Sequence, residues 1–202
     1  MIVLEKEDGL WIARINRPDK ANSLTPGMLE ELAEIAEAAQ EAKALILTGT
    51  GKVFSAGADL EAARAGMATS PLWERLSSAI AALPGLSIAA LNGTIAGGSM
   101  GMALACDIRI AVPSAKVFYP VMKLGFLPQP SDPRRMIDLI GRSRASMILM
   151  AGQKIEASEA QTWGLIDRLV APESLIDEAR ALSADSLAAD PAIARGIKEM
   201  LC

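Results

Sequence analysis

Two stretches of the sequence share one pattern, a run of apolar residues that ends directly in a glycine-rich loop. The first is KALILTGTGK, residues 43–52, and the second is LSIAALNG, residues 86–93, roughly forty residues later. A continuous apolar run bounded by glycines is typical of a strand buried on both faces, as in a parallel sheet. The chain is therefore expected to fold around two buried strands, each of which delivers a loop.

The first half of the chain alternates between extended and helical patterns. Two short apolar segments around Val3 and Trp11, divided by the turn-forming residues KEDG, predict an opening hairpin. Thr25 and Pro26 are the expected N-cap and first residue of an amphipathic helix that reaches about residue 42. Two further short strands are expected on either side of Pro113. Because strand, loop and helix recur, the sequence predicts an α/β fold.

The end of the chain is expected to be mainly helical. Asp132 is the expected N-cap of a helix that begins at Pro133 and runs to about Met150, and Gly164 is expected to end the next helix. The helix that Gly164 ends covers the segment 155–165, and the remaining predicted helices cover 173–188 and 191–201.

Composition excludes several classes of function. With 202 residues and 51% hydrophobic content, the chain can bury a sizeable core as one domain. A net charge of −4 argues against a broad nucleic-acid-binding face. The apolar stretch 86–106 is interrupted by Asn92 and several glycines, so it predicts a strand, a loop and a buried helix and no membrane span.

Two further features of the composition concern redox chemistry and location. The only cysteines, Cys106 and Cys202, indicate neither a disulfide framework nor a cysteine zinc site, and we expect no metal. The early charges of MIVLEKEDG do not fit a secretory signal, so the expected compartment is the cytoplasm.

The loop after the second strand allows more than one chemistry. Residues 97–101, GGSMG, fit the G-x-S-x-G pattern of serine hydrolases, which would make Ser99 a nucleophile. The chain has no histidine, which excludes a Ser-His-Asp triad. The alternative interpretation is that the glycines let a ligand approach the backbone closely.

Four motifs in order resemble the crotonase, or enoyl-CoA hydratase/isomerase, superfamily. They are INRPDKANSL, FSAGADL, NGTIAGGSMGMALACDIRIA and GQKIEASEAQTWGLIDRLV. The resemblance implies a crotonase-like spiral of ββα repeats over residues 1–150, followed by a C-terminal helical region, 151–202, that is shorter than in the family. It also implies a homotrimer or hexamer that binds acyl-CoA.

The resemblance assigns roles to the two loops. The N–H groups of Ala58 and Gly98 would polarise the thioester carbonyl, Ser99 would line the site, and coenzyme A would enter as part of the substrate and not as a permanent cofactor. The adenine would lie against the backbone around Ala56 and Ala58, and the phosphates near two lysines. A simpler explanation of the glycines is close packing alone. The residues expected to bind coenzyme A are Lys20, Ala21, Lys52, Ala56, Ala58 and Leu60.

The sequence departs from the family at the catalytic glutamates. The two positions that carry glutamate in the hydratases are Gly101 and Val121, which can neither accept nor donate a proton. Standard hydratase activity is therefore not expected. Candidate replacements are Asp132, Tyr119, Glu61 and Glu74; alternatively Asp132 is a helix cap, Tyr119 packs in a strand, and both glutamates are solvated.

These observations give three hypotheses. The first is an acyl-CoA enzyme of lyase or isomerase type, in fatty acid metabolism, that stabilises a thioester enolate. The second is a catalytically degenerate protein of the same fold that binds acyl-CoA or acts as a scaffold. The third is a serine hydrolase that uses Ser99.

Overall fold

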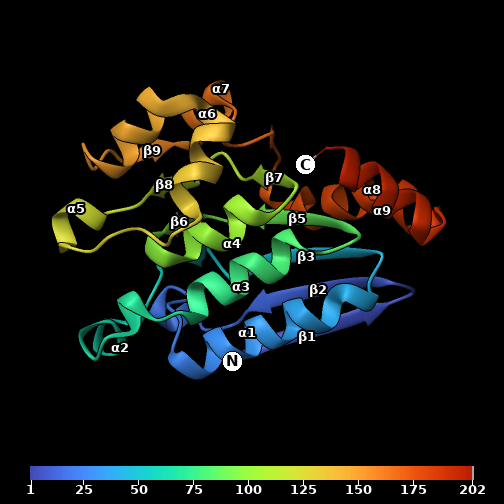
Figure 1. Cartoon of the computed structure of the whole chain (residues 1–202), viewed down its shortest axis with the longest axis horizontal. Coiled ribbons are helices and arrows are strands. Elements are labelled where there is room, and N and C mark those ends of the chain that lie inside the picture. The colour runs from blue at the N-terminus through green and yellow to red at the C-terminus, as the bar shows by residue number, and fades with distance from the viewer. Residues whose placement is uncertain (202) are drawn as a thin grey trace.

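The computed structural model describes residues 1–201, so Cys202 lies outside the described residues. It contains two sheets with helices packed around them (Figure 1). The larger sheet has the strand order β1-β2-β3-β5-β7-β10, and the smaller has the order β4-β6-β8-β9. The strands of the larger sheet are β1 (Ile2–Glu7), β2 (Leu10–Ile15), β3 (Ala44–Gly49), β5 (Leu86–Leu91), β7 (Ile108–Ala111) and β10 (Arg168–Leu169). Those of the smaller sheet are β4 (Val53–Ser55), β6 (Thr94–Ala96), β8 (Lys116–Phe118) and β9 (Ile155–Glu156).

The two predicted buried strands are confirmed as β3 and β5. They pair in parallel near the centre of the larger sheet, with Ile46 opposite Ile88. All six residues of β3 and the last five of β5 are buried. The opening hairpin is confirmed as well, since β1 pairs antiparallel with β2.

A ββα unit repeats three times along the chain. Each of β3, β5 and β7 in the larger sheet is followed by a short strand of the smaller sheet, respectively β4, β6 and β8, and then by helix. Within each sheet these three strands are parallel neighbours. The α/β class and the repeated ββα unit are thus confirmed.

The helices cover the sheets in layers. Helices α1, α3 and α4 pack in a row, and α8 packs against β3, β5 and β7 (Figure 1). In the part of the chain that the structure describes, no helix is long and apolar enough to cross a membrane. The helices are α1 (Pro26–Ala38), α2 (Leu60–Arg64), α3 (Leu72–Ala81), α4 (Met100–Ala105), α5 (Val121–Leu124), α6 (Asp132–Leu149), α7 (Ala157–Trp163), α8 (Leu175–Ala188) and α9 (Pro191–Met200).

Several predicted helix ends are confirmed and one is wrong. The Thr25 side chain accepts a hydrogen bond from the Met28 N–H at 3.3 Å, as an N-cap does. Gly164 ends α7 in the left-handed region, with φ of 86°. Asp132, however, is not an N-cap: Ser131 precedes the helix, and the carboxylate of Asp132 turns away from the helix amides to accept from the side chain of Tyr119.

Two asparagines fasten the loops at the ends of β3 and β5. Asn22 accepts from the Arg17 N–H at 2.8 Å and donates to the carbonyls of Thr50 and Val53 at 2.9 and 2.6 Å. Asn92 donates to the same Val53 carbonyl at 3.1 Å and accepts from the Gly49 N–H at 2.9 Å. Both side chains therefore replace backbone pairing where the chain leaves the larger sheet.

We predict that Asn22→Ala lowers the free energy of unfolding by about 3 kcal/mol. The change removes three hydrogen bonds from a fully buried site and leaves alanine at a φ of 54°, a conformation that asparagine tolerates better because its side chain can form local hydrogen bonds. Urea denaturation measures the change. The control is Asn16→Ala, because the Asn16 side chain makes no hydrogen bond within residues 1–201. If Asn16→Ala lowered the free energy of unfolding as much as Asn22→Ala does, the stabilising role of the Asn22 hydrogen bonds would be contradicted.

Candidate active site

The loops that follow β4 and β6 meet at one edge of the smaller sheet. Both strands are parallel and adjacent, so their following loops leave the sheet on the same side. A methyl group placed on Gly57 would lie 2.8 Å from the Ala96 carbonyl oxygen and 3.4 Å from the Gly98 nitrogen. Gly57 also has a φ of 87°, so close approach and backbone conformation both require glycine there.

One residue from each of these loops, Ala58 and Gly98, lines a common cavity. The N–H of Ala58 donates no hydrogen bond within the described residues, although its neighbours Leu24 and Asp59 pair with the backbone beside it. The N–H of Gly98 belongs to the first turn of a helical segment that starts at Gly97, where amides have no partner within the helix. Both residues border a cavity of about 380 Å³.

Ser99 does not face this cavity. Its side chain is fully buried, and its hydroxyl donates to the carbonyls of Ala96 at 2.7 Å and Ser55 at 3.3 Å. The hydroxyl therefore holds the two loops together and is not presented to a substrate. The hypothesis of a serine hydrolase, and the expectation that Ser99 lines the site, are both wrong.

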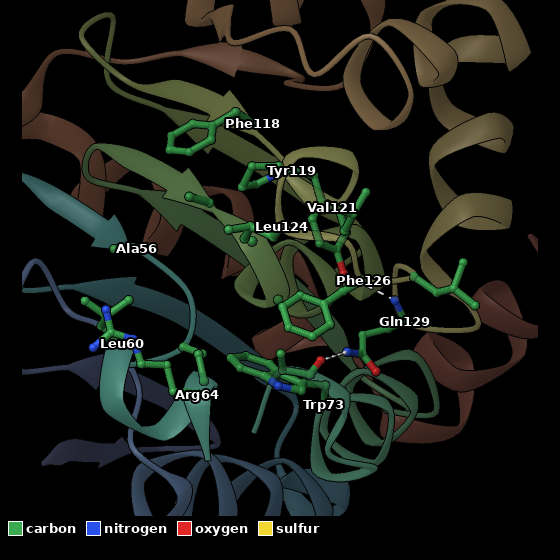
Figure 2. A pocket seen from close by; sticks show the side chains of 18 residues that line it. Ala56, Leu60, Arg64, Trp73, Phe118, Tyr119, Val121, Leu124, Phe126 and Gln129 are labelled. Atoms are coloured by element: carbon green, nitrogen blue, oxygen red, sulfur yellow. Dashed lines mark hydrogen bonds between the residues drawn. The ribbon is translucent and has the colours of Figure 1, made fainter. Parts of the chain in front are cut away.

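The cavity is walled mainly by apolar side chains (Figure 2). Its floor includes Trp73 of α3, whose ring carbons would lie 2.9 to 3.1 Å from a methyl group on Gly98. Val121, at one of the expected glutamate positions, is buried and forms part of the wall. Tyr119 and Gln129 contribute polar atoms, and among the described residues Arg64 of α2 is the one charged residue on the lining.

A buried carboxylate lies against the other expected glutamate position. A methyl group on Gly101 would be 2.9 Å from Asp132 Oδ1, so the carboxyl group of Asp132 fills the space where a side chain at 101 would begin. The side chain of Asp132 is fully buried. Asp132 comes from α6, whereas Gly101 comes from α4, and only the packing of these helices brings them together.

Asp132 and Tyr119 form a hydrogen-bonded pair. The Tyr119 hydroxyl donates to Asp132 Oδ2 at 2.9 Å and accepts from the Gln129 N–H at 3.3 Å. Asp132 Oδ1 has no hydrogen-bond partner among the described residues, and Arg135 Nη1 lies 4.0 Å from it. Tyr119 borders the cavity, so it connects Asp132 to the space in which a substrate would lie.

Burial sets the protonation of this pair. It raises the pKa of Asp132 from 3.8 to about 6, although the hydrogen bond from Tyr119 and the charge of Arg135 oppose the rise. Burial and the adjacent Asp132 carboxylate raise the pKa of Tyr119 far above its usual range. At neutral pH the pair therefore consists of an ionised aspartate that accepts a hydrogen bond from a neutral tyrosine.

The two glutamate candidates lie elsewhere. Glu61 is exposed on α2, as expected. Glu74 was expected to be solvated, and this is wrong: its carboxylate accepts from the Ser131 N–H at 3.2 Å and from the Ser131 and Ser78 hydroxyls. Burial raises the pKa of Glu74, but these hydrogen bonds outweigh it and lower the pKa overall. Glu74 fastens α3 to the start of α6.

Three of the six residues predicted to bind coenzyme A border the cavity. Ala56, Ala58 and Leu60 border the cavity, and the carbonyl of Ala21 accepts from the Ala56 N–H at 3.0 Å. Gly51 lies against Pro18, since a methyl group on it would be 3.3 Å from Pro18 Cβ. Lys20 comes two residues after Pro18, and Lys52 comes directly after Gly51. Both lysines are exposed, and neither borders the cavity.

Sequence reasoning missed several residues of the cavity, among them Trp73, Phe126 and Gln129. The only signal of the two aromatic residues is that such residues are scarce in this chain, and Gln129 has no signal in the sequence. The Trp73 indole N–H donates to the Met67 carbonyl at 2.8 Å, and Gln129 Nε2 donates to the Ala68 carbonyl at 3.3 Å. Both contacts join segments that are far apart or irregular, which no local pattern reveals.

Comparison with known proteins identifies the family. The family model for Enoyl-CoA hydratase/isomerase matches residues 5–202. The chain is 35% identical to the putative enoyl-CoA hydratase/isomerase YngF of Bacillus subtilis, over 96% of this chain and 78% of the relative. It is also 35% identical to the crotonyl-CoA hydratase of Syntrophomonas wolfei, over 90% of this chain and 74% of the relative.

A solved structure agrees with these matches. The enoyl-CoA hydratase from Bacillus anthracis superposes with a TM-score of 0.91 at 32% identity, over 99% of this chain and 81% of that one. The chain therefore belongs to the enoyl-CoA hydratase/isomerase family, the crotonase superfamily, and has the crotonase fold.

We predict that Asp132 makes the folded protein less stable as pH rises from 4 to 7. Its pKa in the folded state is about 6, above its ordinary value, so the unfolded chain gives up this proton at lower pH. The free energy of unfolding should then fall by about 3 kcal/mol across this window, relative to Asp132→Asn, which cannot ionise. Urea denaturation of both proteins at several pH values measures this difference.

The comparison variant is Asp138→Asn, on an exposed part of the same helix. The difference in the free energy of unfolding between this variant and the original protein should not change by more than about 0.5 kcal/mol over the same pH range. If the free energies of unfolding of the original protein and Asp132→Asn differ by the same amount at pH 4 and pH 7, the raised pKa of Asp132 is contradicted.

Proposed function

We propose that this protein is an enzyme that acts on an acyl-CoA thioester and stabilises its enolate with the N–H groups of Ala58 and Gly98. The observation that carries the proposal is the meeting of the two glycine loops, which brings both amides to one apolar cavity. Amides aimed into a cavity of low polarity stabilise a developing negative charge strongly, because they need no reorganisation when the charge forms. Family membership supports the thioester as the ligand.

The coenzyme A portion of the substrate would lie along the rim formed by the segments around Ala21 and Ala56. The backbone there would hold the adenine, with Leu60 beside it, and Lys20 and Lys52 would face the phosphates. Support comes from the contacts that place these segments next to each other. Flexible lysines at a rim suit phosphates, since each is a mobile point charge.

Asp132 and Tyr119 are the proposed acid and base, in place of the glutamates that Gly101 and Val121 lack. The Tyr119 oxygen would take the proton from the carbon next to the thioester carbonyl, while its own proton passes to Asp132 Oδ2, 2.9 Å away. The electron pair of the broken C–H bond would move to the carbonyl oxygen, giving the enolate. Tyr119 would then give one proton to another carbon of the substrate or to a departing group, while Asp132 returns its proton to Tyr119, which would complete an isomerase or lyase reaction.

One observation favours the second hypothesis, a degenerate acyl-CoA-binding or scaffold protein. Asp132 is fully buried and Val121 is apolar, so Tyr119 and Arg64 are the only titratable side chains on the described lining. Such a protein would bind acyl-CoA without forming the enolate. For the enzyme we also propose assembly as a homotrimer or hexamer and a role in cytoplasmic fatty acid metabolism, on the basis of the family.

We predict that the protein catalyses exchange of the protons next to the thioester carbonyl in D₂O. Mass spectrometry of recovered saturated acyl-CoA thioesters, both aliphatic and aryl, measures deuterium uptake without knowledge of the full reaction. Asp132→Asn and Tyr119→Phe should each lower the exchange rate by about 100-fold or more, because each interrupts the proton path. The rate in the original protein should rise with pH as Asp132 ionises, near pH 6.

The control for this experiment is Asp138→Asn, which should exchange at the original rate. Binding of the thioesters, followed by calorimetry, separates the two hypotheses. Binding without exchange would establish the degenerate protein, and the absence of binding by both thioesters and free coenzyme A would overturn acyl-CoA as the ligand.

We also predict that Gly101→Glu and Asp132→Gly compensate each other. Gly101→Glu alone should destabilise the fold, because its Cβ would lie 2.9 Å from Asp132 Oδ1. The double variant frees that space and puts a carboxylate back at 101. The two changes should therefore be non-additive by at least about 1 kcal/mol in urea denaturation, and proton exchange should exceed that of Asp132→Gly alone. Strict additivity would show that positions 101 and 132 do not share one space.

A further inference from the structure

Aromatic residues are few in this chain and most of them gather at one place. The sequence has only seven: three tryptophans, three phenylalanines and one tyrosine. Four of these, Trp73, Phe118, Tyr119 and Phe126, line the cavity that the Ala58 and Gly98 amides border (Figure 2). They come from three separate segments of the chain, so the concentration is a property of the site and not of one local stretch.

Trp73 lies where an acyl group would begin. Three of its ring carbons come within 3.1 Å of a methyl group placed on Gly98, so the indole packs directly on the residue whose amide would hold the thioester oxygen. The ring is fixed by the hydrogen bond from its N–H to the Met67 carbonyl. The first atoms of an acyl group beyond the carbonyl would therefore meet a rigid aromatic surface.

Phe126 is held on the same cavity by its backbone. Gly125 adopts a φ of 72° after α5, and the Phe126 N–H donates to the Val121 carbonyl at 3.1 Å, which fixes the direction in which the ring leaves the chain. The side-chain amide of Gln129 joins this segment to Ala68, near the segment that carries Trp73. Phe126 is 39% exposed, so it is accessible to solvent as well as lining the cavity.

The cavity offers little to a charged acyl group. Within residues 1–201, Arg64 is its one charged side chain, and Arg64 lies exposed on α2. Tyr119 is already committed to Asp132 and Gln129. An apolar ligand with a planar ring would use the aromatic wall best, since stacked and edge-to-face ring contacts add to the gain from burying apolar area.

We propose that the acyl group this protein recognises is a neutral aryl group, such as phenylacetyl, joined to coenzyme A as a thioester. The inference rests on the proposed function, because it assumes that the thioester carbonyl lies at Gly98. It adds the substrate class: rings pack against Trp73 and Phe126 while the carbon next to the carbonyl faces Tyr119. The cavity volume of about 380 Å³ lies in the range of small-molecule sites.

Calorimetric titration with two matched thioesters tests this inference. Phenylacetyl-CoA and cyclohexylacetyl-CoA have the same number of carbon atoms and the same ring size, and differ in whether the ring is aromatic. We expect phenylacetyl-CoA to bind about 3- to 10-fold more tightly, the ratio that one or two aromatic contacts contribute. Hexanoyl-CoA, glutaryl-CoA and free coenzyme A complete the set, as straight-chain, anionic and acyl-free probes.

Phe126→Leu tests the contribution of the ring itself. Because Phe126 is partly exposed, the variant should fold, and circular dichroism and thermal unfolding verify this. It should lower the ratio of the two affinities toward 1, with the contact to Trp73 remaining, while leaving the affinity for free coenzyme A unchanged. Leu127→Ala, an apolar change at an exposed neighbour on the same lining, should preserve the ratio.

The outcomes separate this inference from the proposed function. Equal binding of the two cyclic thioesters, or tighter binding of hexanoyl-CoA or glutaryl-CoA, would overturn the aryl class and leave an acyl-CoA protein. An affinity ratio that Phe126→Leu does not change would remove Phe126 from the assignment and would equally overturn it. Failure of every probe to bind would overturn the proposed function and this inference together.

Discussion

The close backbone contact between the loops after β4 and β6 is the constraint on which the site depends. Gly57 approaches Ala96 and Gly98 so closely that no Cβ fits, and Ser99 fastens the contact by donating across it. Parallel pairing of β4 with β6 places both loops at one edge, and Asn22 and Asn92 fix the turns that lead into these strands. A change at this contact would move both amides relative to the cavity.

The polar pair beside the cavity depends on a second constraint, the packing of α6 against α4. Glycine at 101 leaves room for the carboxylate of Asp132, and Tyr119 and Arg135 partly compensate its burial. The carboxylate thus comes from α6 and occupies the space beside position 101 of α4. The burial that raises the pKa of Asp132 therefore depends on the absence of a side chain at 101.

Much of the fold was predictable because the signals are local. The apolar runs of β3 and β5, the Thr25 cap and the stop at Gly164 each depend on neighbouring residues, and each prediction is confirmed. The errors concern polar side chains whose partners lie far along the chain. Asp132 has the local pattern of a helix cap, but its carboxylate accepts a hydrogen bond from Tyr119. Glu74 has the pattern of a solvated helix residue, but its carboxylate accepts a hydrogen bond from the Ser131 N–H. A local pattern cannot reveal a partner that tertiary packing supplies.

The α/β class and the two glycine loops follow from the sequence alone, because apolar periodicity and glycine spacing act over a few residues. The family follows from the resemblance of four ordered motifs, and the sequence also shows that histidine and the two expected glutamates are missing. The position of Asp132, the need for a small residue at Gly101, and the cavity that Trp73 and Phe126 share with Gly98 follow only from the packing. These relations join residues from different helices and loops, and they exist only once the helices pack against the sheets.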